Sequence, residues 1–344
     1  MIPSALIRAC CAAVLLFAPP ALAQDPPPDD PPLRRWFEID FARLGMRYRV
    51  IENSSDVVTS NHLQHREQFR ARFKFDARGR YAVHAGLFTG SAFTGSWNAT
   101  GIGTGSASAT LRLKQLFAAA TPVDGVQAQV GGLYVIRGEQ TEVTSYDQDA
   151  FIMGERIQVT RPDDLWLDEI AFTVARLDDL NRPNVTHRWD GMGDPNYGQL
   201  LVRKAFGPVR ASTDLTVVEG ARTLRAAVSI PLEPVGLQLE GYRRFRDTPA
   251  GGFAVSIERA IGRTLTVGGG YATIDPDYGH VNGDRFDIGR RVFTSAALDV
   301  TPWLALDLFV TRAIANDFPV AIGTRFDAVL TFDLLPSLRR TGVF

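Results

Sequence analysis

The residues of this chain that could do chemistry are charged side chains placed at every second position of apolar segments. Residues 69–76 read Phe-Arg-Ala-Arg-Phe-Lys-Phe-Asp, an unbroken alternation. An extended strand would place all these charges on one face, whereas a helix would scatter them. Walls of charge around an aqueous passage determine which ions prefer it. The charged residues that we expect on such faces are Arg47, Arg49, Arg70, Arg72, Lys74, Arg112, Lys114, Asp299, Asp307, Asp327 and Asp333.

Other groupings of reactive residues carry less weight. His62 and His65 could form a metal pair, but no third ligand is near in the sequence, and we interpret both as solvated loop residues. The segment 275–284 lacks the ligand order of an EF-hand loop, and the acidic segment 139–149 is interpreted as a solvated loop. The glycines of 101–105 do not follow a strand as a dinucleotide-binding loop would. The sequence therefore predicts no catalytic site, no metal and no cofactor.

Composition excludes several classes of protein. The 37 Lys and Arg residues balance 38 Asp and Glu residues, so nothing points to a nucleic-acid partner. Beyond the amino terminus, no apolar run approaches the roughly 20 residues of a membrane-spanning helix. Only two cysteines occur, Cys10 and Cys11, which excludes a disulfide framework.

The elements that would position the charges are strands of about ten residues, long enough to cross a bilayer when tilted. Apolar residues at alternate positions recur over 81–87, 224–230, 235–239, 253–257, 265–267, 296–300, 304–310 and 326–334. The parity changes near residues 43–44, and a β-bulge near Gly45 would restore it.

The connections alternate between two kinds. Short turns are expected at 77–79, 122–125, 161–164, 207–208, 231–234, 260–263 and 301–302. Mostly longer links lie between them, at 53–66, 90–105, 139–150, 177–196 and 275–285, with short ones at 219–220 and 248–251. This pattern is typical of outer-membrane barrels. It predicts an all-β fold, a transmembrane antiparallel up-and-down β-barrel of about 16 strands over residues 36–335.

Two further features bear on this prediction. Trp36, Trp166 and Trp303 fall at strand ends on the short-turn side, where an aromatic girdle belongs. A soluble β-sandwich also shows alternation, but the second face here carries Arg, Lys, Gln and Asp and is too polar for a dry core.

The two ends of the chain differ from the barrel. Residues 1–23 predict a signal peptide, with Arg8, an apolar stretch at 12–18 and cleavage after Ala23. Residues 24–35 predict a Pro-rich periplasmic linker and 336–344 a C-terminal tail. Export without cysteine in the mature chain fits a bacterial envelope.

The ALAQ cleavage site, the strands FRARFKFD and FDAVLTFDLL and the final Phe344 together resemble Gram-negative outer-membrane porins. The resemblance implies the cell outer membrane, contact with its lipid and lipopolysaccharide, insertion by the barrel-assembly machinery, passage of small hydrophilic solutes, and often a homotrimer. One departure is that residues 336–340 separate the last alternating strand from Phe344. Either that strand is longer than the pattern indicates, or Phe344 lies in a tail.

On this interpretation the chain is a passive diffusion channel. The cations between Arg47 and Lys114 would form a basic wall of the passage. The carboxylates Asp299, Asp307, Asp327 and Asp333 on the last strands, with Glu38 and Asp40 on the first, would oppose it. Such a passage would favour anions modestly. Alternatively, these charges only neutralise one another on adjacent strands. Other open alternatives are a substrate-specific, alginate-export-like transporter and a surface enzyme or adhesin on a barrel scaffold. The loops 90–105 and 177–196 are long enough to fold inward.

Overall fold

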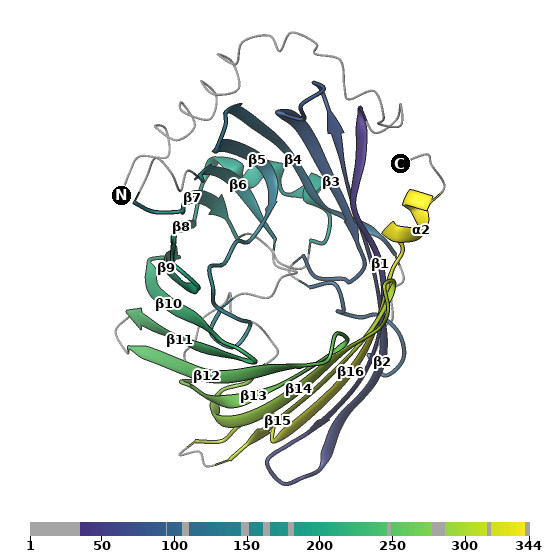
Figure 1. Ribbon diagram of the computed structural model, residues 1–344, viewed down its shortest axis with the longest axis vertical. Coiled ribbons are helices and arrows are strands. Elements are labelled where there is room, and N and C mark those ends of the chain that lie inside the picture. Colours follow the sequence, from purple (N-terminus) through teal and green to yellow (C-terminus); the bar gives the residue numbers. More distant parts are fainter. Residues whose placement is uncertain are drawn as a thin grey trace.

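The sixteen strands of the computed structural model form one closed antiparallel barrel, in which β1 pairs with β16 (Figure 1). The structure describes residues 35–93, 95–104, 110–145, 151–160, 166–177, 182–245, 249–276, 286–314 and 318–340. The strands are β1 (Phe37–Glu52), β2 (Val58–Lys74), β3 (Tyr81–Phe88), β4 (Arg112–Val123), β5 (Val126–Tyr134), β6 (Phe151–Val159), β7 (Glu169–Arg176), β8 (Tyr197–Phe206), β9 (Val209–Val218), β10 (Ala221–Leu232), β11 (Val235–Phe245), β12 (Ala250–Ile261), β13 (Leu265–Ile274), β14 (Gly289–Thr301), β15 (Leu304–Ala313) and β16 (Thr324–Asp333).

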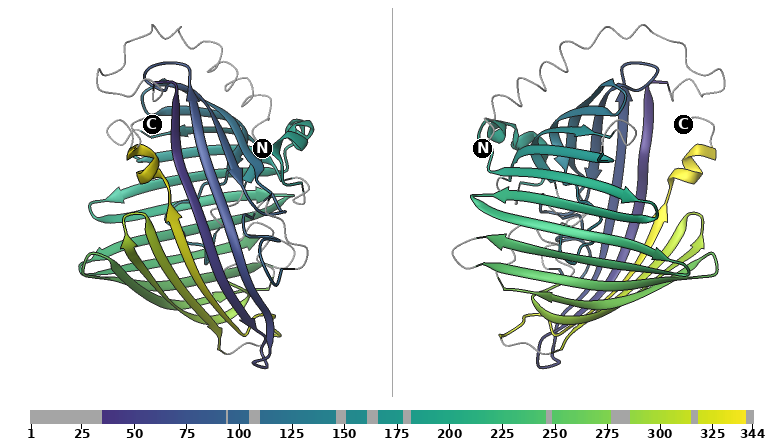
Figure 2. Two further views of the ribbon diagram at one scale, coloured as in Figure 1. Left: turned by 90° about the vertical axis from the view of Figure 1, so that its right-hand side faces the viewer. Right: turned by 60° about the vertical axis from the view of Figure 1, so that its left-hand side comes forward.

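Every strand pairs with its neighbours in the sequence, which confirms the predicted fold class. The connections alternate as expected. Short turns such as 207–208 join the strands at one end, which we call the turn end. The longer connections gather at the opposite end, which we call the loop end. Figure 2 shows the strands inclined around the barrel, with β1 and β2, of 16 and 17 residues, running past their neighbours.

The alternation along the strands separates two environments. Outward side chains include Phe73, Phe253 and Ile257, which are about half exposed. Inward side chains include Arg47 and Gln64, which are buried. The strands form with this period because apolar residues occupy one face and polar residues the other.

Tryptophans border the turn end. Two of them, Trp36 and Trp303, immediately precede β1 and β15, and Trp166 lies shortly before β7. All three are exposed. Trp303 stacks on Phe332 with ring centroids 6.3 Å apart. Beside this border, the Lys204 ammonium and the Ala205 backbone N–H hold the pKa of the Asp168 carboxyl below its ordinary value.

Two local predictions on the first hairpin were wrong. The segment 53–66 is not a loop, because β2 begins at Val58 and only residues 53–57 connect the strands. Residues 58–66 lack alternating apolar side chains, but they still form a strand because their backbone pairs with β1 in a long hairpin. The second wrong prediction is the β-bulge near Gly45, because the alternation changes earlier in β1. The register between β1 and β2 shifts at Asp40, so that Phe41 lies opposite the inward Arg70.

The end of the chain departs from a simple terminal strand. β16 ends at Asp333, and residues Leu335–Arg340 form the short helix α2 beside β1. Phe344 lies outside the described residues, as do the predicted signal peptide and nearly all of the Pro-rich linker. Of the helices that the structure describes, none combines the length and apolar character needed to cross a bilayer.

Candidate functional site

The inward face of β1 carries two arginines in the half of the strand nearer the loop end, opposite polar residues of β2. Arg47 lies opposite Gln64, and Arg49 lies opposite His62. Both arginine residues are only 7% exposed. The Nε and Nη2 atoms of Arg47 donate hydrogen bonds to Oε1 of Gln64, at 3.0 and 2.7 Å. We call Arg47 and Arg49 the central arginine pair.

The cations of β2 that lie nearer the turn end form ion pairs with carboxylates of β1. Arg72 Nη2 lies 2.8 Å from Glu38 Oε2, and Lys74 Nζ lies 3.4 Å from the same atom. Arg70 Nε lies 3.0 Å from Asp40 Oδ2. These predicted site residues therefore meet anions on the adjacent strand, so much of their positive charge is neutralised locally.

The acidic closing strands adjoin the basic wall instead of facing it. Asp327 on β16 lies opposite Arg49 on β1, and their side chains are 2.8 Å apart. Arg325 also contacts Asp327, at 2.7 Å. The expectation of opposed charges across the passage is wrong for these residues, because closure of the barrel makes β1 and β16 neighbours.

The other three acidic site residues share the face of Asp327. Asp333 lies opposite Arg43 of β1, and Asp307 of β15 lies opposite Val329 of β16. Asp299 lies near the turn end of β14 and is exposed. All three thus stand on the β14–β16 side, next to the basic wall.

Lys114 serves as an anchor for the β3–β4 loop. Its side chain is fully buried, and its Nζ donates hydrogen bonds to the backbone carbonyls of Thr89, Ala92 and Gly95 at 2.6, 2.8 and 2.6 Å. Arg112, two residues earlier, lies opposite Phe88. Lys114 therefore positions a loop and presents little charge to solvent.

The β3–β4 loop, which Lys114 anchors, runs beside the part of β2 that extends past the end of β3. Leu63 and Ile102 exchange backbone hydrogen bonds of 3.1 and 2.8 Å. Gly101 and Gly103 have φ angles of 76° and 84°, and a Cβ atom there would meet the carbonyl oxygens of Leu63 and Asn61 at 2.0 and 2.2 Å. These glycines permit the close approach that places the loop against the wall.

The Trp97 side chain of this loop lies inside the lumen, against the inward face of β1 and β2. Its ring lies between two guanidinium groups, those of Arg47 at 4.4 Å and Arg66 at 4.5 Å from the ring centroid. The tip of the ring reaches Gly45, where a Cβ atom would lie 3.0 Å away. The backbone carbonyl of Trp97 accepts a hydrogen bond of 2.9 Å from Gln64 Nε2. The prediction that loop 90–105 can fold inward agrees with this placement of its described residues.

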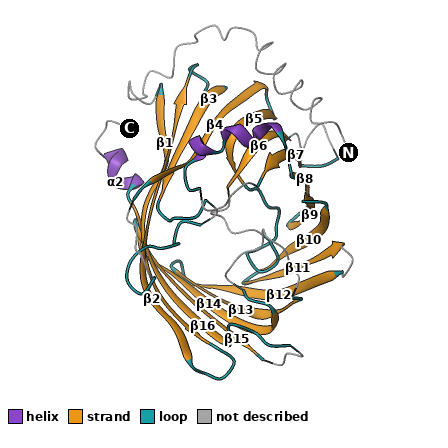
Figure 3. Ribbon diagram, turned by 180° about the vertical axis from the view of Figure 1, so that it is seen from behind, coloured by secondary structure: helices purple, strands orange, loops and turns teal. Residues whose placement is uncertain are grey.

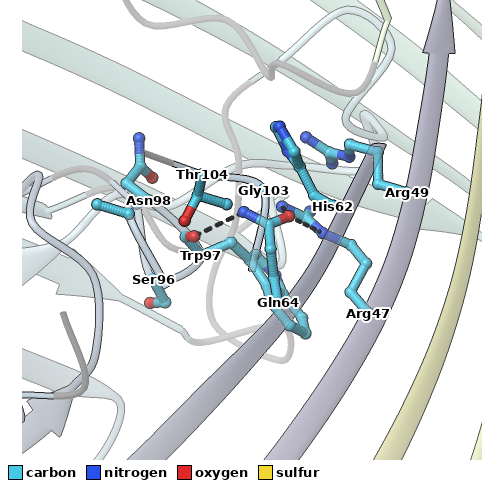
Figure 4. A pocket seen from close by; sticks show the side chains of 11 residues that line it. Arg47, Arg49, His62, Gln64, Ser96, Trp97, Asn98, Gly103 and Thr104 are labelled. Carbon is cyan, nitrogen blue, oxygen red and sulfur yellow. Dashed lines mark hydrogen bonds between the residues drawn. The ribbon is translucent and has the colours of Figure 1, made fainter. Parts of the chain in front are cut away.

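The loop and the wall enclose a polar cavity of about 310 Å³ (Figure 4). The central arginine pair and His62 border it on one side, and Ser96, Asn98 and Thr104 on the other. Cationic groups and neutral donors thus converge on one space. Such a lining suits a hydrated anion better than an apolar molecule.

A second segment crosses the lumen from the end of β5. Residues 135–145, which we call the strap, reach the inward face of β8 to β11. Buried Glu240 accepts hydrogen bonds from the backbone N–H of Thr141 at 2.8 Å, from the Thr141 hydroxyl, and from the Thr144 hydroxyl at 2.6 Å. Arg225 Nε donates to the Thr144 carbonyl at 3.1 Å. The strap is therefore fixed at a distance from the strand that it leaves.

An apolar contact completes this attachment. Val143 of the strap is 6% exposed and packs in a cluster with Tyr242, Phe286 and Phe309. The prediction that segment 139–149 is a solvated loop was therefore wrong for residues 140–144. Residues 146–150 lie outside the described part of the chain.

The third long connection covers the loop end. It contains two short 3-10 helices, η1 (Val185–His187) and η2 (Trp189–Gly193), which contact β4 and β6 respectively. Figure 3 shows them lying across the ends of these strands. Arg188 between them is 1% exposed and stacks over Phe93 at 3.9 Å. The described residues 182–196 thus cover the ends of β4 and β6, beside the loop that contains Trp97.

Several buried inward cations were not among the predicted site residues. Arg156 donates hydrogen bonds to Thr173 Oγ1 at 3.0 Å and to Gln129 Oε1 at 3.1 Å. Arg291 donates to the Ile322 carbonyl at 2.9 Å. The parity of their strands could have identified both.

The two histidines considered as a metal pair do not face each other. His62 and His65 lie on β2 and not in a loop, and they face opposite sides of the wall because three positions separate them. No group of three or more His, Cys, Asp or Glu side chains in the described part is placed to hold a metal. Asp275 accepts a hydrogen bond of 2.7 Å from the Gly251 backbone N–H, whereas Asp277, Asn282 and Asp284 lie outside the described residues.

Fold and lumen together define a porin-like barrel, closed, sixteen-stranded and narrowed by inward segments. Among solved structures, the chain resembles Salmonella typhi OmpF in a complex with daunomycin, with a TM-score of 0.59, 8% sequence identity, and coverage of 86% of this chain and 97% of that chain. It also resembles a mutant of the Rh. blastica porin, with a TM-score of 0.57, 11% identity, and coverage of 86% and 100%. No protein-family profile and no curated protein matches the sequence. At these identities the likeness concerns the fold.

Proposed function

We propose that this chain is an outer-membrane channel through which small hydrophilic solutes and ions diffuse passively. The observation that carries the proposal is the two-sided barrel wall. Large apolar side chains stand out from its exterior, while arginine, lysine, glutamine and carboxylate side chains line its interior. Lipid solvates the first surface and water the second.

The orientation follows from the same arrangement. The turn end would face the periplasm and the loop end the exterior, with the predicted signal peptide and the barrel-assembly machinery delivering the chain. Outer-membrane lipid and lipopolysaccharide would then surround the exposed outward residues.

The segments inside the lumen would set the size of the solutes. The strap and the Trp97 loop both reach away from the strand ends and take up space that the barrel alone would leave open. Because Glu240 and Lys114 fix them by buried charged hydrogen bonds, the narrowing would be permanent and not a transient closure.

The charges of the interior favour a modest anion preference. The central arginine pair borders the polar cavity of about 310 Å³, and among buried side chains on the strands cations outnumber carboxylates. Apart from Lys114, whose ammonium donates to the loop carbonyls, the cations are Arg47, Arg49, Arg156, Arg225, Arg244, Arg291 and Arg325, and the carboxylates are Glu169, Asp214, Glu240 and Asp327. A net positive lining raises the local concentration of anions.

The reversal potential in a planar bilayer under a KCl gradient tests this preference. We expect the sign of an anion-preferring channel for the native protein and a shift toward cations for Arg47→Gln/Arg49→Gln. Arg259→Gln, on the outward face of β12, is the matched control and should leave the potential unchanged. A native channel that prefers cations, or a double variant identical to the native channel, would contradict the role of the central arginine pair.

A further inference from the structure

The helix α2 turns away from the barrel at the end of the last strand. The Asp333 carboxylate accepts a hydrogen bond of 2.9 Å from the Leu335 backbone N–H at the start of the helix. The backbone N–H of Leu334 donates to the Ala42 carbonyl of β1 at 2.8 Å, so pairing with β1 continues up to the helix. Figure 2 shows α2 outside the barrel wall, beside β1. The passage of solutes through the lumen gives this helix no task.

The helix begins at the aromatic border of the turn end. Phe332, which lies opposite Leu44 of β1, stacks with Trp303 just before the chain enters α2. Trp36, immediately before β1, is 49% exposed. Exposed tryptophans mark the depth of the lipid headgroups in membrane proteins. In the proposed orientation, α2 therefore lies at the headgroups of the leaflet that surrounds the turn end.

The outer wall next to α2 is apolar and lacks acidic residues. The large outward side chains on the turn half of β14, β15 and β16 are those of Leu298, Val300, Leu304, Leu306, Leu308, Leu330 and Phe332. The carboxylates described on these three strands, those of Asp299, Asp307, Asp327 and Asp333, all face inward. Lipid acyl chains can therefore contact this surface directly beside the helix.

Two consecutive arginines end the helix at this depth. The two leucines of α2 are half-buried, whereas Arg339 and Arg340 in its last turn are exposed. Lys204, an outward cation elsewhere at the turn end, is instead neutralised by Asp168, with 2.9 Å between the charged atoms. Guanidinium groups bind phosphate through paired hydrogen bonds. The end of α2 thus offers phosphate-binding groups at the depth where phospholipid phosphates lie.

We infer that α2 binds the headgroup phosphate of an anionic phospholipid in the leaflet at the turn end. Arg339 and Arg340 donate hydrogen bonds to the phosphate oxygens, and the acyl chains lie on the apolar wall of β15 and β16. An anionic headgroup fits better than a zwitterionic one, because the outward face of β14 to β16 has no described carboxylate for a lipid ammonium group. The inference rests on the proposed membrane-spanning channel.

Native mass spectrometry of the protein in detergent tests this site. The native protein should retain phosphatidylglycerol in preference to phosphatidylcholine. Because one arginine near a membrane surface changes lipid affinity about 5-fold, Arg339→Gln/Arg340→Gln should weaken phosphatidylglycerol binding about 10- to 30-fold. Arg259→Gln/Arg263→Gln removes two exposed charges from the same end, is the matched control and should bind like the native protein. Equal binding by the two double variants, or a native protein without preference, would overturn the inference. Cations in the last turn also complement the helix dipole, so lipid binding and not stability is the quantity to measure.

A measurement on the native sequence covers the case in which the α2 variant fails to fold. In lipid vesicles, phosphatidylglycerol with brominated acyl chains should quench the tryptophan fluorescence more than brominated phosphatidylcholine, because Trp303 borders the same wall. Excess inorganic phosphate should not reverse this quenching, since free phosphate has no acyl chains. Equal quenching by the two lipids, or reversal by phosphate, would contradict the lipid site. A protein that conducts ions yet shows no lipid preference would remove this site alone, whereas one that never conducts would remove the proposed channel.

Discussion

Glu240 holds the strap in the lumen, and its removal should widen the passage. The Glu240 carboxylate is 5% exposed and accepts hydrogen bonds from the Thr141 backbone N–H, the Thr141 hydroxyl and the Thr144 hydroxyl. Hydrogen bonds to a charged group contribute about 1.5–3 kcal/mol each, and they are not additive when they share an acceptor. For Glu240→Ala we expect a loss of about 3–5 kcal/mol of attachment free energy, which shifts the equilibrium between attached and detached strap by about 150- to 4,000-fold.

Single-channel recording and limited proteolysis read out this change. Glu240→Ala should give a larger and noisier conductance than the native channel, and its strap should be cleaved faster. Glu258→Ala is the matched control, because Glu258 lies exposed on the inward face of the adjacent β12. If Glu240→Ala matched the native protein in both conductance and cleavage, the strap would not be held as the structure indicates.

Three further perturbations follow from the same contacts. Asp327→Asn should lower the free energy of unfolding in urea by about 3–5 kcal/mol, because it leaves two buried arginines without their carboxylate, whereas Asp299→Asn at an exposed position should change it by about 0.5 kcal/mol or less. Lys114→Met should release the β3–β4 loop and alter single-channel conductance, while circular dichroism still reports the barrel. Gly101→Ala should have a similar effect on conductance, because the added Cβ would meet the Leu63 carbonyl at 2.0 Å, and native conductance in this variant would refute the placement of the loop.

The barrel could be predicted from the sequence because lipid and water impose opposite demands on neighbouring residues. Along residues 69–75 the apolar side chains all fall on the outward face and the charged ones on the inward face. The alternation of short turns and longer loops shows where one strand ends and the next begins, and the structure confirms the predicted number and order of strands. Each of these signals is local in the sequence.

The same local signals fail where long-range contacts decide the structure. Residues 58–66 form a strand although they are polar, since pairing with β1 satisfies their backbone. The attachment of the strap joins Thr141 to Glu240, 99 positions away, and no periodic pattern reports such a contact. Asp327 neutralises Arg49 across 278 positions only because the barrel closes. The charged residues could thus be placed on a face, but their partners could not be named.

The conductance of the purified native protein tests the proposed channel most directly. Reconstituted into a planar lipid bilayer in KCl, it should produce discrete, repeated current steps with a linear current–voltage relation near zero voltage, as a water-filled cylinder with fixed internal segments requires. A protein that inserts fully folded into the bilayer and yet produces no steps above the lipid background would contradict passive diffusion through the lumen.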